Sequence, residues 1–281
     1  MSTHTVFRAY RYQLLPLDRN QTKDLYHDIS AKEIITRKNQ FFSEALTHLP
    51  KINHKRVELH ISVEEIQKDF FRIQLAPSRP LTRETADSRR EKVENWPHID
   101  AYILNNQDDQ LLIIQERVTA FANTDTVANI ILRGTRGVLD KIGLSLQIEP
   151  LFDESYFWGL VNQYSNRITW VEFEFVTPNM ANISKTLVNT LKNLGKETNA
   201  VREQLTLRSD PLSSLDITPS NELIQGLVEY TSKGAGDIKL KIKGIRKRFQ
   251  TSTSRREVHL SGIEVTADAK EIIEIIREAL R

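Results

Sequence analysis

The chain has 281 residues, of which 39% are hydrophobic and 27% are charged. This composition excludes a mainly disordered chain, and the length suits one large domain or two modest ones. Lys and Arg number 39 against 37 Asp and Glu, so the net charge of +2 gives no global reason to expect a polyanionic partner. The absence of cysteine excludes disulfides, thiolate metal sites and cysteine nucleophiles.

The N-terminal residues contain no apolar segment of the kind found in a secretory signal. The longest apolar runs, such as residues 111–114, are far too short to span a bilayer. We therefore expect a cytoplasmic protein with no membrane partner.

Hydrophobic periodicity, turn residues and capping signals predict strands and helices along the whole chain. The predicted strands cover residues 5–15, 57–61, 70–75, 98–104, 110–117, 144–148, 168–176, 237–243 and 258–265. The predicted helices cover residues 31–49, 124–142, 183–194 and 267–280, with two more that begin after Asp153 and Ser220. The charged stretch 82–94 is expected to be a solvated helix or a loop, and 201–207 the end of a helix or a strand.

Local signals support several of these boundaries. Ser30 and Glu33 have the spacing of a capping box, and Gly143 stands where a C-cap glycine is expected. Strands and helices mix along the chain with frequent hairpins, which predicts the α+β class with mixed or antiparallel sheets and packed helices. A boundary near residue 152 would divide the chain into 1–152 and 153–281, with a single domain as the alternative.

The sequence nominates no catalytic residue, metal site or cofactor. It contains neither a GxxxxGK[ST] nor a GxGxxG phosphate loop, and the turn at Gly234–Gly236 follows a helix instead of preceding one. His54 and His60 have no companion ligands, and no GxSxG motif is present. Glu172 and Glu174 share one face of a strand, which we interpret as a solvated face.

One hairpin has the layout of a metal-dependent nuclease site. Asp100 lies on its first strand, and Gln115, Glu116 and Arg117 lie on its second. Nucleases of this kind use a lysine where Arg117 stands, and the pKa of arginine is too high for a proton role. Gln115 is also a poor metal ligand, so nuclease activity is kept as an alternative.

A basic cluster between residues 233 and 256 is the clearest departure from average composition. Asp237 is the single acidic residue in this segment. Nine cations occur here: Lys233, Lys239, Lys241, Lys243, Arg246, Lys247, Arg248, Arg255 and Arg256.

Strict alternation at 237–243 predicts a strand with one apolar and one basic face. Lys239, Lys241 and Lys243 would follow one another at roughly 7 Å, a spacing that matches phosphates along a nucleic-acid strand. Arg246, Lys247 and Arg248 would extend this face, Arg255 and Arg256 complete the predicted binding residues, and Phe249 offers a stacking surface. The alternatives are a solvated sheet face, an edge strand protected by lysines, or a site for an acidic protein.

Four segments of the chain carry a resemblance to a known group of proteins. They are Trp96–Asp100, Leu112–Arg117 leading to Ala120–Phe121, Phe157–Trp158, and Ile168–Phe175 followed by Pro178–Asn179. Over residues 96–180 the chain resembles uncharacterised bacterial proteins associated with anti-phage defence neighbourhoods. The resemblance implies a defence-system subunit that acts with partner proteins, and it carries over no functional residues.

Three hypotheses follow. The first is a nucleic-acid-binding or sensing subunit of a bacterial anti-phage defence system, which predicts salt-dependent binding through the basic cluster. The second is a non-catalytic subunit that assembles with an effector protein or with itself, through an exposed apolar or mixed-charge patch around Trp96 or Phe157–Trp158. The third is the nuclease at Asp100.

Overall fold

The computed structural model describes residues 5–22, 29–49, 58–107, 109–176, 193–195, 197–260 and 268–280. The chain divides into two compact units that are discontinuous in sequence. Unit 1 comprises Met1–Arg8, Arg37–Ile142 and Glu257–Arg281, and unit 2 comprises Ala9–Thr36 and Gly143–Arg256. The expected boundary at residue 152 falls inside unit 2, and the division into domains stays a prediction.

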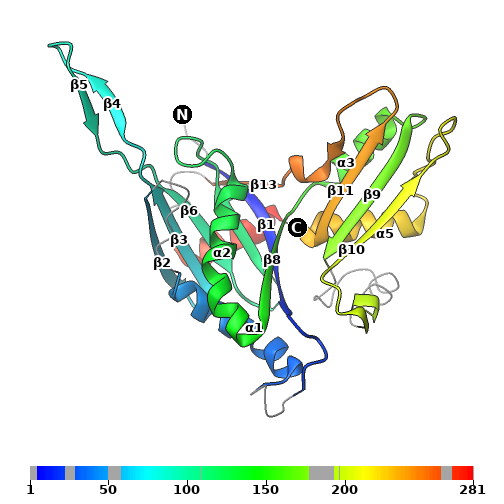
Figure 1. Ribbon diagram of the computed structural model, residues 1–281, viewed down its shortest axis with the longest axis horizontal. Helices are drawn as coiled ribbons and strands as arrows, with labels where there is room; N and C mark the ends of the chain where they lie inside the picture. The colour runs from blue at the N-terminus through cyan, green and yellow to red at the C-terminus, as the bar shows by residue number, and fades with distance from the viewer. Residues whose placement is uncertain are drawn as a thin grey trace. The chain divides into compact units, whose positions relative to one another are not determined.

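Unit 1 is built on a sheet in which neighbouring strands have the order β13-β1-β7-β6-β3-β2. The strands are β1 (Thr5–Pro16), β2 (Leu59–Gln67), β3 (Phe70–Pro77), β6 (Ile99–Leu104), β7 (Leu111–Gln115) and β13 (Glu257–Leu260). Strand β1 continues into unit 2 from Ala9 onward. The helices are α1 (Ala31–Thr47), which begins in unit 2, α2 (Thr124–Ile142) and α6 (Ala269–Ala279). Every residue of β6 is buried, and α2 runs along the near face of this sheet in Figure 1.

A separate two-stranded ribbon leaves unit 1 at residues that were expected to form a solvated helix or a loop. It consists of β4 (Leu81–Glu84) and β5 (Arg90–Val93), and every residue in both strands is exposed. Arg83 pairs with Glu91 at 3.0 Å and Arg90 with Glu84 at 3.2 Å. The charges are therefore cross-strand partners of a hairpin, and the ribbon extends away from the rest of unit 1 (Figure 1).

Unit 2 contains a four-stranded antiparallel sheet of order β10-β9-β11-β12. Its strands are β9 (Ile168–Val176), β10 (Arg202–Arg208), β11 (Gly236–Ile242) and β12 (Phe249–Gln250). The helices α3 (Glu154–Gln163) and α5 (Glu222–Tyr230) share a buried apolar cluster with β9 and β11, so they cover one face of this sheet. Strand β8 (Leu144–Pro150) pairs with the second half of β1.

A tight approach of β11 to β9 fixes the start of β11. A Cβ at Gly236 would lie 1.9 Å from the carbonyl oxygen of Glu174, so a larger residue cannot occupy this position without displacing backbone. The chain enters β11 from α5 through a short turn, η1 (Thr231–Ala235), in which Gly234 has φ 79°. These two glycines set the entry of the chain into the basic strand.

The α+β class predicted from the sequence is confirmed, and every strand pairing with a described register is antiparallel. The capping box is present, with the Ser30 amide 2.8 Å from the Glu33 carboxylate and the Glu33 amide 3.3 Å from the Ser30 hydroxyl. Segment 201–207 forms most of strand β10, which runs from Arg202 to Arg208. The cap of α5 is Asn221, not Ser220, because the Asn221 side chain accepts from the amides of Leu223 and Ile224.

Several expectations fall on residues outside the described ranges. They concern most of the expected helix 183–194, the end of the expected strand 258–265, and Pro178–Asn179.

Candidate nucleic-acid interface

Strand β11 has the two faces that its alternation predicts, but it ends at Ile242, so Lys243 lies in the turn that follows and not on the strand. Ile238, Leu240 and Ile242 are each at most 1% exposed and face the helices, whereas Lys239 and Lys241 project from the other face. The strand lies between β9 and β12 and is not an edge strand. Strand β12 pairs with Lys239 and Leu240, so Lys239 does not serve to protect a free sheet edge.

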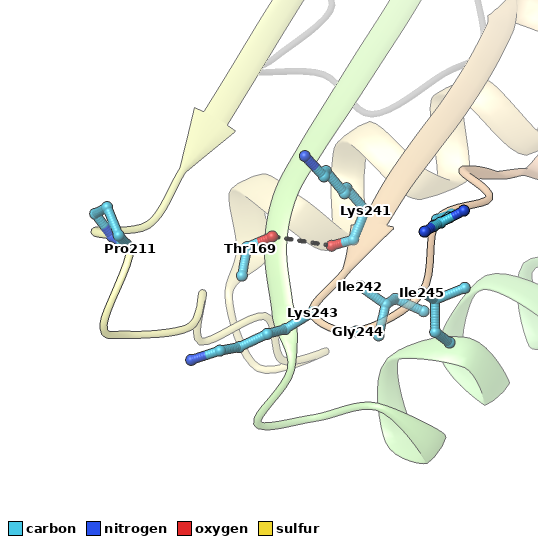
Figure 2. A pocket seen from close by; sticks show the side chains of 8 residues that line it. Thr169, Pro211, Lys241, Ile242, Lys243, Gly244 and Ile245 are labelled. Carbon is cyan, nitrogen blue, oxygen red and sulfur yellow. Dashed lines mark hydrogen bonds between the residues drawn. The ribbon is translucent and has the colours of Figure 1, made fainter.

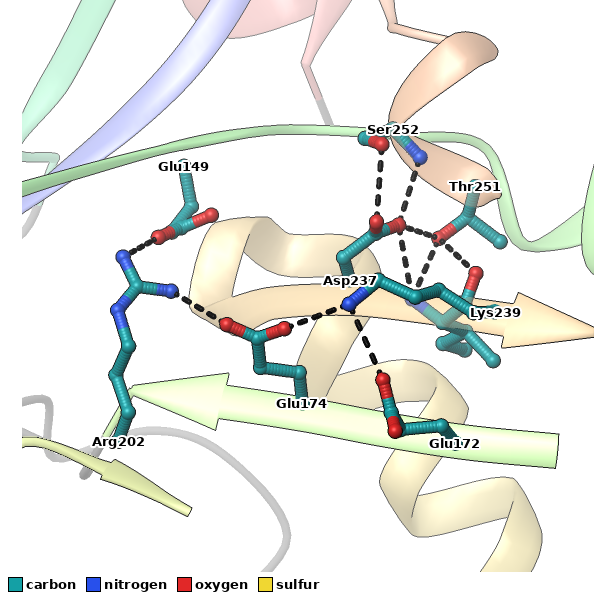
Figure 3. Close-up of polar contacts among 9 residues, drawn as sticks. Glu149, Glu172, Glu174, Arg202, Asp237, Lys239, Thr251 and Ser252 are labelled. Atoms are coloured by element: carbon teal, nitrogen blue, oxygen red, sulfur yellow. Dashed lines mark hydrogen bonds and ion pairs between the residues drawn. The ribbon is translucent and has the colours of Figure 1, made fainter. Parts of the chain in front are cut away.

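Lys239 is held by two carboxylates of the neighbouring strand. Its Nζ lies 3.1 Å from Glu172 Oε1 and 2.9 Å from Glu174 Oε2, and about one fifth or less of each side chain is exposed. The register of the sheet places Lys239 directly opposite Glu172. Lys239 therefore belongs to an ion-pair network within the sheet (Figure 3). The two glutamates, interpreted from the sequence as a solvated face, are its partners in this network.

Arg202 of β10 extends this network. Its guanidinium pairs with Glu174 at 3.0 Å and also with Glu149 of β8, whose side chain is 12% exposed (Figure 3). Burial raises the pKa of Glu149, although the charge of Arg202 opposes the shift. Burial would raise the pKa of Glu174 as well, but hydrogen bonds and charge from Lys239 and Arg202 outweigh it and lower that pKa.

Asp237, the acidic residue of the basic segment, also has a structural role. Its carboxylate accepts hydrogen bonds from the Thr251 hydroxyl at 2.8 Å, the Ser252 amide at 2.9 Å and the Ser252 hydroxyl at 3.0 Å. These bonds attach the short helix η2 (Thr251–Thr253) to β11 (Figure 3). Hydrogen bonds from this loop therefore engage both carboxylate oxygens of Asp237.

Three exposed residues of the basic cluster line an open hollow at the end of β11. This basic hollow has a volume of about 740 Å³ and is lined by Thr169, Pro211 and residues 241–246. Its cationic groups are Lys241, Lys243 and Arg246, all of them exposed. Among the residues that the structure describes, none of these three side chains has a carboxylate partner.

A tight turn presents the hollow's basic side chains. The Ile245 amide bonds to the Ile242 carbonyl at 3.1 Å, and Gly244 takes φ 83° inside this turn. Arg167 supports the turn, since its Nε and Nη2 donate to the Lys243 carbonyl at 3.3 and 2.8 Å. Figure 2 shows the Lys243 side chain reaching across the start of β9 toward the side on which Pro211 lies.

The sheet register adds a basic residue that sequence reasoning missed. Arg208 of β10 lies opposite Trp170, and Trp170 lies opposite Lys241, so all three belong to one row across the strands. Arg208 is exposed, and Arg248 covers the Trp170 ring with its guanidinium carbon 4.9 Å from the centroid. Alternation within 202–208 places Arg208 on one face of its strand, but only the register brings it to this row.

The remaining predicted binding residues are dispersed. Lys247 is exposed, while Arg255 and Arg256 are partly buried, with the Arg255 guanidinium carbon 5.8 Å from the centre of the Tyr10 ring. Lys233, at the other end of the strand, pairs with Glu229 at 2.6 Å. Phe249 packs against the core cluster and Tyr164, which takes its ring away from a stacking role.

The hairpin considered as a nuclease site has its polar groups engaged. Asp100 is 5% exposed and its carboxylate pairs with Arg72 at 2.9 Å. The Gln115 side chain accepts from the Asp100 amide at 2.9 Å, and Arg117 donates to the His98 carbonyl at 2.9 Å. These contacts are those of a polar strand pair and leave the carboxylate with a cationic partner.

The second hypothesis placed an apolar patch at Phe157–Trp158 or Trp96. Phe157 is fully buried and Trp158 packs against the core of unit 2, whereas 37% of Trp96 is exposed. Within the described ranges, no three His, Asp or Glu side chains are grouped as a metal site would require. The described helices include none with the length and apolar character needed to cross a membrane.

The comparisons with known proteins add no further constraint: no family model, no curated protein and no solved structure matches the chain.

Proposed function

We propose that unit 2 binds the phosphate backbone of a nucleic acid at the basic hollow, and that the protein is a nucleic-acid-binding or sensing subunit of a bacterial anti-phage defence system. The observation that carries the binding proposal is the set of exposed lysine and arginine side chains around the hollow without carboxylate partners in the described part of the chain. The defence role rests on the resemblance over residues 96–180.

The chemistry of the hollow suits phosphate better than bases. Its charged groups are ammonium and guanidinium donors, which neutralise phosphates without reading sequence. The nearby aromatic rings are not available for stacking on bases. Trp170 is 8% exposed and covered by Arg248, and Phe249 packs against the core cluster. Binding is therefore expected to be strongly salt dependent and weakly dependent on base sequence.

The test is binding of the full chain to labelled single-stranded DNA, RNA and duplex DNA by fluorescence anisotropy across a salt series. The variant Lys241→Glu/Lys243→Glu/Arg246→Glu removes the hollow's cations. The control Lys32→Glu/Lys68→Glu/Lys92→Glu makes the same charge change at exposed lysines on α1, between β2 and β3, and on β5.

We expect the wild type and the control to bind, with log Kd rising linearly with log salt concentration. The hollow variant should lose at least tenfold in affinity, and its salt slope should fall by about 2–3, one phosphate contact for each cation removed. If the wild type binds none of the three nucleic acids, or if both variants weaken binding equally, the proposal fails. The protein-interaction subunit then becomes the better hypothesis.

A further inference from the structure

The loop after β10 exposes an apolar side chain beside the basic hollow. Leu212 is 92% exposed, more than any other large hydrophobic residue that the structure describes. A single exposed leucine is common and by itself indicates nothing. Its position is what matters here, because the preceding residue, Pro211, lines the basic hollow together with Lys243 and Arg246.

Both ends of this loop are attached to the first residues of β9. The Ser209 amide donates to the Thr169 carbonyl at 3.1 Å, and the Leu215 amide donates to the Ile168 carbonyl at 2.7 Å. Thr169 itself lines the hollow. The loop and the hollow therefore share one rigid support.

The tip of the loop is also held from within. The Ser209 hydroxyl lies 3.1 Å from the Asp210 carbonyl and 3.2 Å from the Ser213 carbonyl, and the Leu212 amide donates to the Asp210 carboxylate at 3.0 Å. Proline at 211 fixes φ at the residue before Leu212. The backbone of a loop held in this way loses little conformational entropy when its tip is inserted into a partner.

We infer that Pro211–Leu212 is an apolar wedge that enters between two bases of a nucleic acid whose phosphates occupy the basic hollow. The inference rests on the proposed function and specifies its ligand class, namely nucleic acid with an unstacked or unpaired step. Proteins that insert Leu or Pro between base steps must unstack them, which costs a few kcal/mol in an intact duplex and less where a base is already unpaired. A bulged duplex is therefore the preferred ligand.

An anionic membrane is the other surface that attracts cations beside an exposed leucine. Stable attachment to a bilayer needs more apolar area than one side chain supplies. A tip that is small, rigid and next to phosphate-binding groups fits a base step better. The experiment below therefore includes vesicle binding, which detects attachment to an anionic membrane.

The experiment compares two duplexes of one sequence, one intact and one with a single-nucleotide bulge, with 2-aminopurine beside the bulge. The variants are Leu212→Ala and, as matched control, Leu223→Ala, which truncates a leucine that is 52% exposed on α5. Full-length protein is used, and vesicles of phosphatidylserine and phosphatidylcholine are included.

We expect the wild type and Leu223→Ala to bind the bulged duplex about tenfold more tightly than the intact one and to increase 2-aminopurine fluorescence. Leu212→Ala should lose the preference and the fluorescence change while keeping its affinity and salt slope on the intact duplex. Equal wild-type binding to both duplexes, or a preference that survives in Leu212→Ala, would overturn the wedge and leave phosphate binding intact. If the wild type binds neither duplex, the proposed function is overturned as well. Vesicle binding that is lost in Leu212→Ala would then point to an anionic membrane as the ligand.

Discussion

Lys239 and Lys241 lie on the same face of the same strand, yet we predict that their replacement by methionine has different consequences. Lys239→Met should lower the stability of the fold, whereas Lys241→Met should weaken nucleic-acid binding. Lys239 contacts Glu172 and Glu174 at 3.1 and 2.9 Å. Methionine would leave these two carboxylates without that cation. Lys241 is exposed and has no carboxylate partner among the described residues, so methionine removes only a surface charge.

The cost of Lys239→Met follows from the exposure of the pair. Exposed ion pairs contribute about 0.2–1 kcal/mol, while removal of one partner from a buried pair costs about 3–5 kcal/mol. The Lys239, Glu172 and Glu174 side chains are 21%, 16% and 20% exposed, so an intermediate loss of about 1–3 kcal/mol is expected. Lys241→Met should change the free energy of unfolding by less than about 0.5 kcal/mol.

Urea denaturation followed by tryptophan fluorescence measures this difference, because Trp158 and Trp170 both lie in unit 2. The midpoint of Lys239→Met should fall by about 0.5–1 M urea relative to the wild type. In the nucleic-acid assay the order reverses: Lys241→Met should reduce the salt slope by about 0.7–0.9, and Lys239→Met should leave it unchanged.

The effect should also depend on pH in a defined direction. The pKa of Glu174 is lowered in the folded protein, so its ion pair stabilises the fold above the usual carboxylate pKa of about 4.3. That stabilisation disappears as the pH falls through the folded-state pKa, and the gap between wild type and Lys239→Met should narrow with it. Equal urea midpoints for the two methionine variants at pH 7, or a lower salt slope in Lys239→Met, would refute the assignment of Lys239 to the sheet network.

Three further predictions concern the fold. Gly236→Ala should destabilise the protein by more than about 3 kcal/mol, because its Cβ would lie 1.9 Å from a backbone oxygen, and an unchanged melting temperature would contradict this close approach. Asn221→Ala should cost about 1 kcal/mol by removing the cap of α5, whereas Ser220→Ala should cost almost nothing; equal urea midpoints would show that the cap is misassigned. Burial lowers the pKa of Lys38 to about 8, below its unfolded value of 10.5, so the protein should gain stability as the pH rises from 8 to 10.5. Lys38→Met should raise the urea midpoint at pH 7 and abolish that gain, and a midpoint that falls as the pH rises would show that Lys38 stays charged.

Local sequence signals determined most of the elements. The capping box at Ser30, the glycine after α2 and the aspartate before α3 are contacts between residues close in sequence, so periodicity and turn chemistry suffice to predict them. The alternation of residues 237–243 likewise determined which side chains of β11 are buried. The ribbon β4–β5 was missed because its charged residues satisfy each other across two strands instead of showing an apolar face.

The candidate site depended on tertiary structure. Lys239 and Lys241 are equivalent in the sequence, and only the register of β11 against β9 places Glu172 opposite one and Trp170 opposite the other. The basic hollow similarly combines residues near 169, 211 and 243, which no local pattern connects. A run of cations fixes the composition of a surface, but the pairing of strands distant in sequence decides which of those cations are neutralised and which remain exposed to a ligand.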